Sequence, residues 1–109
     1  LLNSGVTIQA RAAITLGDNC LIGDHCQIHD TNYHEVDEGA GVTSAPITIG
    51  RNVWLGREVI VLPGVTIGDH SVVAARSVVT KSIPARSLAA GSPASVLREI
   101  VASDGWVRR

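Results

Sequence analysis

The residues best suited to chemistry gather in one short stretch, residues 27–38. It contains two histidines, His29 and His34, together with Asp30, Asn32 and the only tyrosine of the chain. A neutral imidazole with an ordinary pKa accepts a proton from a hydroxyl at physiological pH, so either histidine is a candidate general base. The two histidines and the aspartate are also a conceivable set of metal ligands. Their spacing alone leaves these roles open.

This stretch interrupts a repeat with a period of six residues. On its C-terminal side apolar residues recur at Ile49, Leu55, Val61, Ile67, Val73 and Val79. On its N-terminal side Leu16, Ile22 and Ile28 have the same spacing. A helix needs a period near 3.6 and a simple strand a period of 2. A period of six is typical of hexapeptide repeats, in which each unit forms one short strand and one corner, and three units form a triangular coil.

The composition agrees with a narrow, strand-lined core. The 109 residues suffice for one domain, and they include no Phe and no Met, whereas Val and Ile supply 24 residues. Branched aliphatic side chains favour strands and fill a thin core without aromatic rings. An eighteen-residue coil predicts that Ile49 stacks on Ile67, Leu55 on Val73 and Val61 on Val79, at the spacing of neighbouring strands, about 4.8 Å.

The phase of the repeat predicts which segments leave the coil. The step from Ile28 to Ile49 is twenty-one residues, a phase loss of three, so a loop protrudes at about residues 30–45. The step from Ile8 to Leu16 is eight, so that corner holds two extra residues. His34 then lies on the loop.

Three further features follow from the same phase. We expect the β-helix over residues 1–92 and a helical cap or tail over residues 93–109. His29 directly follows a core residue and is expected at a corner. His25 and His70 each follow a Gly-Asp pair and are expected to be solvated corner residues.

Composition also restricts the partners. The net charge is −1 and the Lys and Arg residues are scattered, which argues against nucleic acid. No run of 18 apolar residues occurs, so no membrane span is expected. Cys20 and Cys26 lack a CxxC neighbour, which predicts reduced core thiols in a cytoplasmic protein. The chain begins in mid-pattern and without Met, so we expect it to be part of a longer protein.

Four phrases carry a family resemblance: "NVWLG", "PGVTIGD", "SVVTKSIP" and "AAGSPA", in that order. With them the chain resembles the maltose, galactoside and nodulation-type O-acetyltransferases and the acetyltransferases of surface polysaccharides. The resemblance implies an all-β, left-handed parallel β-helix and transfer of an acetyl group from acetyl-CoA to a saccharide hydroxyl. It also implies a homotrimer with active sites between subunits, and no metal.

The resemblance assigns the catalytic residues. The family pattern Asp-x-Asp/Asn-x-His is similar to "DTNYH", which makes His34 the general base and leaves His29 as the weaker alternative. A backbone N–H at Gly56–Arg57 is the implied donor to the oxyanion. Nothing indicates a covalent intermediate, so direct transfer in a ternary complex is expected.

Acceptor contacts are implied for Asn3 and Trp54. Asn3 matches an asparagine that binds acceptor hydroxyls in the family, and is otherwise a turn residue. Trp54 should point outward, either as a structural contact or as a ligand contact. Asp30 and Asn32 either contact the acceptor or orient the loop, because Asx side chains often cap their own turn.

Coenzyme contacts are implied for Ala75, Thr80, Lys81 and Arg98, and the last two could pair with phosphates. The family usually reads Gly-Ala-Gly-Ser-Val-Val-Thr here, whereas this chain reads "AARSVVT". Arg76 therefore replaces a glycine and either narrows the pantetheine track or adds a phosphate contact.

Two other functions remain open from the residues. The acceptor could be serine, an antibiotic hydroxyl or the nitrogen of an amino sugar, or the chain could be an inactive scaffold subunit. The loop with His34 argues against the scaffold.

Overall fold

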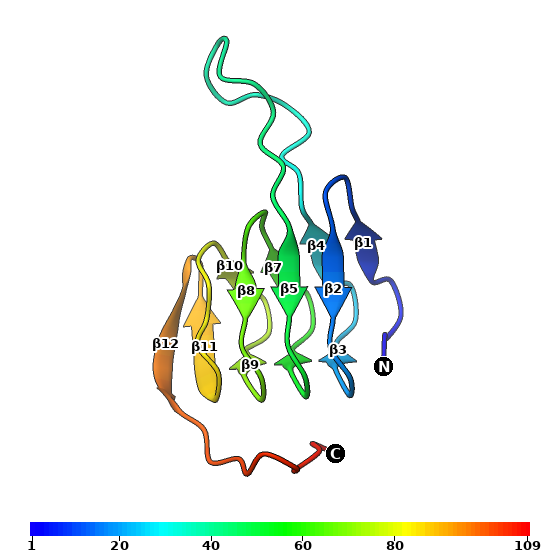
Figure 1. Cartoon of the computed structure of the whole chain (residues 1–109), viewed down its shortest axis with the longest axis vertical. Helices are drawn as coiled ribbons and strands as arrows, with labels where there is room; N and C mark the ends of the chain where they lie inside the picture. The colour runs from blue at the N-terminus through cyan, green and yellow to red at the C-terminus, as the bar shows by residue number, and fades with distance from the viewer.

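The computed structural model describes the whole chain, residues 1–109, as a β-helix with one protruding loop (Figure 1). The strands are β1 Thr7–Gln9, β2 Ile14–Leu16, β3 Leu21–Ile22, β4 Gln27–His29, β5 Ile47–Ile49, β6 Trp54–Leu55, β7 Ile60–Val61, β8 Thr66–Ile67, β9 Val72–Val73, β10 Val78–Val79, β11 Ser87–Gly91 and β12 Ala94–Glu99. They form three faces, ordered β1-β4-β7-β10, β2-β5-β8 and β3-β6-β9-β11, with β12 at the edge of the last. The chain rises on the far face and descends on the near face as it advances from β1, so the β-helix is left-handed (Figure 1).

The core consists of stacked side chains, as the six-residue period predicts. Ile49 pairs with Ile67, Leu55 with Val73, and Val61 with Val79, all in parallel register. These side chains are almost completely buried. The three predicted stacks are confirmed, and branched aliphatic residues suffice because each one meets its equivalent in the next coil.

The two cysteines belong to the same core. Cys20 and Cys26 are buried free thiols, and their Sγ atoms donate to the carbonyl oxygens of Gly50 at 3.0 Å and Gly56 at 3.1 Å. Burial raises the pKa of both thiols, which makes them poor nucleophiles. The prediction of reduced core thiols agrees with these positions.

The loop leaves the coil where the phase is lost. It lies between β4 and β5 and projects far beyond the coils (Figure 1). An antiparallel bridge between Thr31 and Ser44 closes its root, and the N–H of Ala45 donates to the carbonyl of Asp30 at 2.9 Å. The predicted excursion at residues 30–45 is therefore confirmed.

The predicted C-terminal helix is wrong. Residues 94–99 form β12, which pairs antiparallel with β11. Strand β11 continues the parallel ladder by pairing with β9, so its other edge would expose unpaired backbone groups. A strand satisfies those groups directly, whereas a helix cannot. The structure contains no helix long and apolar enough to cross a bilayer.

The tail after β12 crosses one corner of the coil and covers His70. The imidazole of His70 is buried, and its Nδ1 lies 2.8 Å from Asn52 Nδ2. The imidazole also stacks on the indole of Trp106, with 6.4 Å between the ring centroids. The prediction of a solvated His70 is thus wrong, because a segment beyond the repeat covers that corner. His25, which no such segment covers, is exposed as expected.

Candidate active site

A groove of about 590 Å³ runs across successive coils on the β3-β6-β9-β11 face. Its lining residues are Asn3, Gly23, Asp24, Trp54, Gly56, Arg57, Val72, Val73, Ala74, Ala75 and Leu88. Five residues that were predicted for three different roles thus share one wall: Asn3, Trp54, Gly56, Arg57 and Ala75. The six-residue period explains this gathering, since strand ends and corners of successive coils lie above one another.

The backbone around Gly56 offers one free donor to the groove. The Gly56 N–H already donates to the carbonyl of Val73 at 2.9 Å, as part of the ladder between coils. The N–H of Arg57 makes no hydrogen bond within the chain. Of the two predicted positions, only Arg57 therefore has a donor to spare for a developing oxyanion.

Gly23 keeps that donor accessible. A Cβ on Gly23 would lie 2.7 Å from the nitrogen of Arg57 and 2.8 Å from the carbonyl carbon of Gly56. Real Cβ atoms do not approach backbone that closely, so only glycine fits between these coils. Gly56 is under the same constraint, because its Cβ would lie 2.7 Å from the nitrogen of Ala75.

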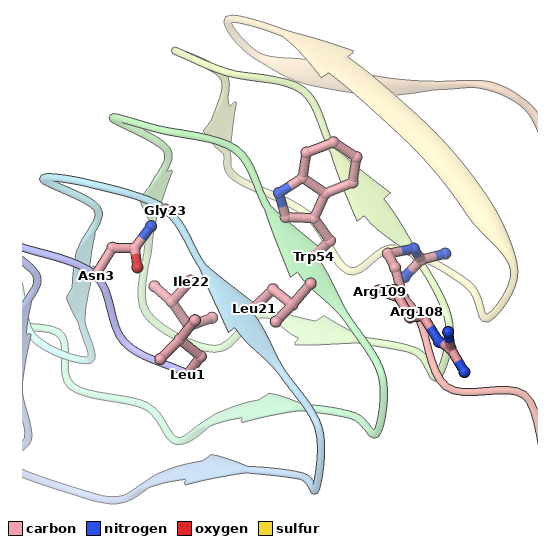
Figure 2. A pocket seen from close by; sticks show the side chains of 8 residues that line it. All are labelled: Leu1, Asn3, Leu21, Ile22, Gly23, Trp54, Arg108 and Arg109. Carbon is pink, nitrogen blue, oxygen red and sulfur yellow. The ribbon is translucent and has the colours of Figure 1, made fainter.

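Trp54 separates the groove from a second, smaller hollow. Its side chain projects outward from β6 and is 45% exposed, as predicted. The hollow has a volume of about 230 Å³ and is lined by Leu1, Asn3, Leu21, Ile22, Gly23, Trp54, Arg108 and Arg109 (Figure 2). Asn3, Gly23 and Trp54 line both spaces, so the two are adjacent.

The residues predicted to bind coenzyme do not all gather in the groove. Ala75 lies in it, whereas Thr80 and Lys81 are exposed at the corner after β10, and Arg98 is exposed on β12. Arg76 lies outside the groove lining, and its Nε donates to a carboxylate oxygen of Glu58 at 3.3 Å.

Arg76 also has an unusual backbone. Its φ is 63° and that of Glu58 in the coil below is 58°, so both adopt the left-handed conformation in which glycine is easiest. The N–H of Arg76 donates to the carbonyl of Arg57 at 2.9 Å. The corner at Arg76 thus has the same backbone conformation as the corner at Glu58, and this conformation costs a non-glycine residue about 1–2 kcal/mol.

His34 is exposed and lies on the loop, away from the groove of its own chain. The loop leaves at the corner between the faces of β4 and β5, whereas the groove lies on the third face. In a triangular coil these positions are separated by the body of the β-helix (Figure 1). Within one chain the predicted base and the predicted oxyanion donor are therefore not brought together.

The root of the loop is held by Tyr33, the residue before His34. Its hydroxyl donates to Gln9 Oε1 at 2.5 Å and is hydrogen-bonded to His29 Nδ1. The backbone φ of Tyr33 is 64°, and its N–H donates to Thr31 Oγ1 at 3.2 Å. The two contacts of the Tyr33 hydroxyl anchor the loop to β1 and β4. Both ring nitrogens of His29 are hydrogen-bonded, because Nε2 also lies 2.8 Å from Gln27 Oε1.

The carboxylate of Asp30 also holds the root of the loop. This buried carboxylate accepts hydrogen bonds from the N–H groups of Arg11 at 2.7 Å and Ala12 at 2.8 Å. The Arg11 N–H bond holds the pKa of the Asp30 carboxyl below its usual range. Arg11 and Ala12 lie in the wide corner between β1 and β2, so the side chain secures both that corner and the loop root.

Several lining residues were not among the predictions. Gly23 could have been found, because the period places it in "LIG" at the same strand end as Gly56 in "WLG". Arg108 and Arg109 could not, since they lie beyond the last repeat.

Comparison with known proteins shows which proteins this chain is similar to. The family model described as "Bacterial transferase hexapeptide (six repeats)" matches residues 46–81. Galactoside O-acetyltransferase of Escherichia coli (strain K12) is 46% identical over 101 residues, which cover 90% of this chain and 50% of that protein. The chain is thus similar to the hexapeptide-repeat transferases over most of its length. This hexapeptide-repeat protein spans about half the length of that relative.

Solved structures of hexapeptide-repeat proteins share the fold. An acetyltransferase of Vibrio cholerae O1 biovar eltor, complexed with acetyl coenzyme A, is 38% identical with a TM-score of 0.85, over 93% of this chain and 57% of that chain. A polysialic-acid-specific acetyltransferase is 28% identical with a TM-score of 0.86, over 99% of this chain and 51% of that chain.

Proposed function

We propose that this hexapeptide-repeat protein transfers an acetyl group from acetyl-CoA to a hydroxyl of a saccharide. The observation that carries the proposal is the unpartnered N–H of Arg57, which lies in a groove bordered by an outward tryptophan. The names of the relatives support it, because one acts on galactosides and another was solved with acetyl coenzyme A.

The proposed reaction assigns one role to each of these groups. The imidazole of His34 accepts the proton of the acceptor hydroxyl as its oxygen attacks the thioester carbon. The Arg57 N–H donates to the oxyanion of the tetrahedral intermediate. The thiolate of CoA then leaves without acid assistance, and the acetyl group stays on the acceptor. No residue of the chain is acetylated in this route.

The separation of the loop and the groove supports a site that is shared between subunits. His34 lies away from the groove of its own chain, so in the proposed reaction a second copy supplies it. We infer a homotrimer in which each loop reaches the groove of a neighbour, since cyclic symmetry closes such a head-to-tail contact.

The remaining predicted residues divide between the two substrates. Asn3 and Trp54 face the acceptor end of the groove, and Asn32, exposed on the loop, approaches from the partner. Asp30 orients the loop, because backbone N–H groups occupy its carboxylate. Ala75 borders the pantetheine arm, while Thr80 and the cations of Lys81, Arg76 and Arg98 contact the nucleotide end.

A thiol-release assay with acetyl-CoA and a panel of acceptors tests the proposal. Release with galactosides or other sugars is expected. Release only with serine, antibiotic or amino acceptors would replace the saccharide with another acceptor class, and no release with any acceptor would favour a scaffold. Sedimentation should find a trimer, and a strict monomer would contradict the shared site.

A further inference from the structure

The hollow beside Trp54 differs in character from the groove. Figure 2 shows the indole of Trp54 standing over Leu21, with Leu1 and Asn3 at one end and Arg108 and Arg109 at the other. The floor is apolar and none of the eight lining residues is acidic. A ligand that enters this space meets an aromatic face, one amide and two guanidinium groups.

The position of the two arginines is set by the fold. Arg108 is half-buried, and its guanidinium donates to the carbonyl oxygens of Asn52 at 2.6 Å and His70 at 3.0 Å. It also lies over the ring of Trp106, 4.8 Å from the centroid. The backbone N–H of Arg108 donates to Asn52 Oδ1 at 2.8 Å. The tail is therefore fixed to the coil at the residue that precedes Arg109.

The side chain of Arg109 makes no such contacts. Arg109 is exposed, lines the hollow, and its side chain makes no hydrogen bond or ion pair within the chain. Elsewhere in the chain, the guanidinium groups of Arg57, Arg76 and Arg86 each have a carboxylate partner. The side chains that line the hollow thus include two guanidinium groups and no carboxylate partner for them.

We propose that this hollow binds an anionic group of the acceptor, so that the acceptor is an acidic saccharide. The inference rests on the proposed function, since it assigns an acceptor to the same site. Trp54 offers an apolar platform for the C–H face of a sugar ring. The Asn3 amide bonds a hydroxyl, and the planar fork of Arg109 fits a carboxylate in bidentate fashion. The acceptor hydroxyl then points past Trp54 into the groove.

The test compares two sugars that differ only at C6, where one carries a carboxylate and the other a hydroxymethyl group, so acetyl transfer is scored at the ring hydroxyls that both sugars share. Acetyl transfer to methyl galacturonide and to methyl galactoside is measured for the wild type, Arg109→Gln and Arg11→Gln. Arg11 is an exposed arginine at a corner outside the hollow and the groove, so its replacement is a matched change of charge. We expect the wild type to favour the galacturonide by about tenfold in kcat/KM. Arg109→Gln should abolish that preference through KM while Arg11→Gln keeps it.

Two results would overturn the inference. One is equal behaviour of Arg109→Gln and Arg11→Gln with both sugars. The other is a raised KM for acetyl-CoA in Arg109→Gln that disappears with 3′-dephospho-acetyl-CoA, because the anion would then be a coenzyme phosphate. If the wild type acetylates neither sugar, the proposed function fails separately. Calorimetric titration with the two sugars then decides, since preferential binding of the galacturonide supports the acidic subsite and equal binding rejects it.

Discussion

Replacement of Gly23 by alanine should stop acetyl transfer through a single methyl group. The new Cβ would lie 2.7 Å from the Arg57 nitrogen and 2.8 Å from the Gly56 carbonyl carbon, and backbone on both sides cannot yield cheaply. Overpacking of this kind costs about 1–3 kcal/mol of unfolding free energy. The methyl group would also cover the Arg57 N–H, and loss of one oxyanion donor lowers kcat by about 10²–10³-fold.

Gly17 provides a matched control for the steric cost. Its Cβ would lie 2.6 Å from the Arg51 nitrogen and 2.6 Å from the Gly50 carbonyl carbon, so the clash is similar, but the residue lies outside the groove. Gly17→Ala should lose comparable stability in urea unfolding and keep its kcat in the thiol-release assay. If Gly23→Ala turned over as fast as Gly17→Ala, the assignment of the Arg57 N–H would be refuted.

Three further predictions concern the segments around the site. Asp30→Asn should lower stability to urea above about pH 5. Folding lowers the pKa of the Asp30 carboxyl, so its stabilising contribution is complete above the unfolded pKa of about 3.9 and disappears as pH falls through the folded pKa. Equal stability of the variant and the wild type at neutral pH would contradict the contact. Tyr33→Phe should speed amide hydrogen exchange in residues 30–45 and lower kcat with little change in KM, and unchanged exchange would argue against the anchor. Asn52→Ala should release the tail and cost about 1–3 kcal/mol, measured by unfolding and by proteolysis after residue 100, whereas an intact tail would show that its buried bonds are dispensable.

The coil could be predicted from the sequence because a strict period maps each residue onto one face. Ile49, Leu55 and Val61 predicted their partners correctly, and the broken phase after Ile28 located the loop. The same counting predicted that Trp54 points outward, whereas the role of Gly56 came from the family resemblance.

The period carries no information beyond its last unit, and the errors lie there. The segment 94–99 was predicted as a helix because nothing in it reports that β11 leaves an open edge. His70 was predicted to be exposed because its cover, Trp106, is thirty-six positions away in a tail without a pattern. The charge of the hollow depends on Arg109, whose position follows from three-dimensional contacts of the tail.

The proposed reaction depends above all on His34 as the base that activates the acceptor hydroxyl. The most direct test is kcat for acetyl transfer by His34→Ala at saturating acetyl-CoA and acceptor, with sedimentation as the control for assembly. We expect a fall in kcat of about 10²–10⁴-fold in an intact trimer. Turnover within a few-fold of the wild type would contradict it.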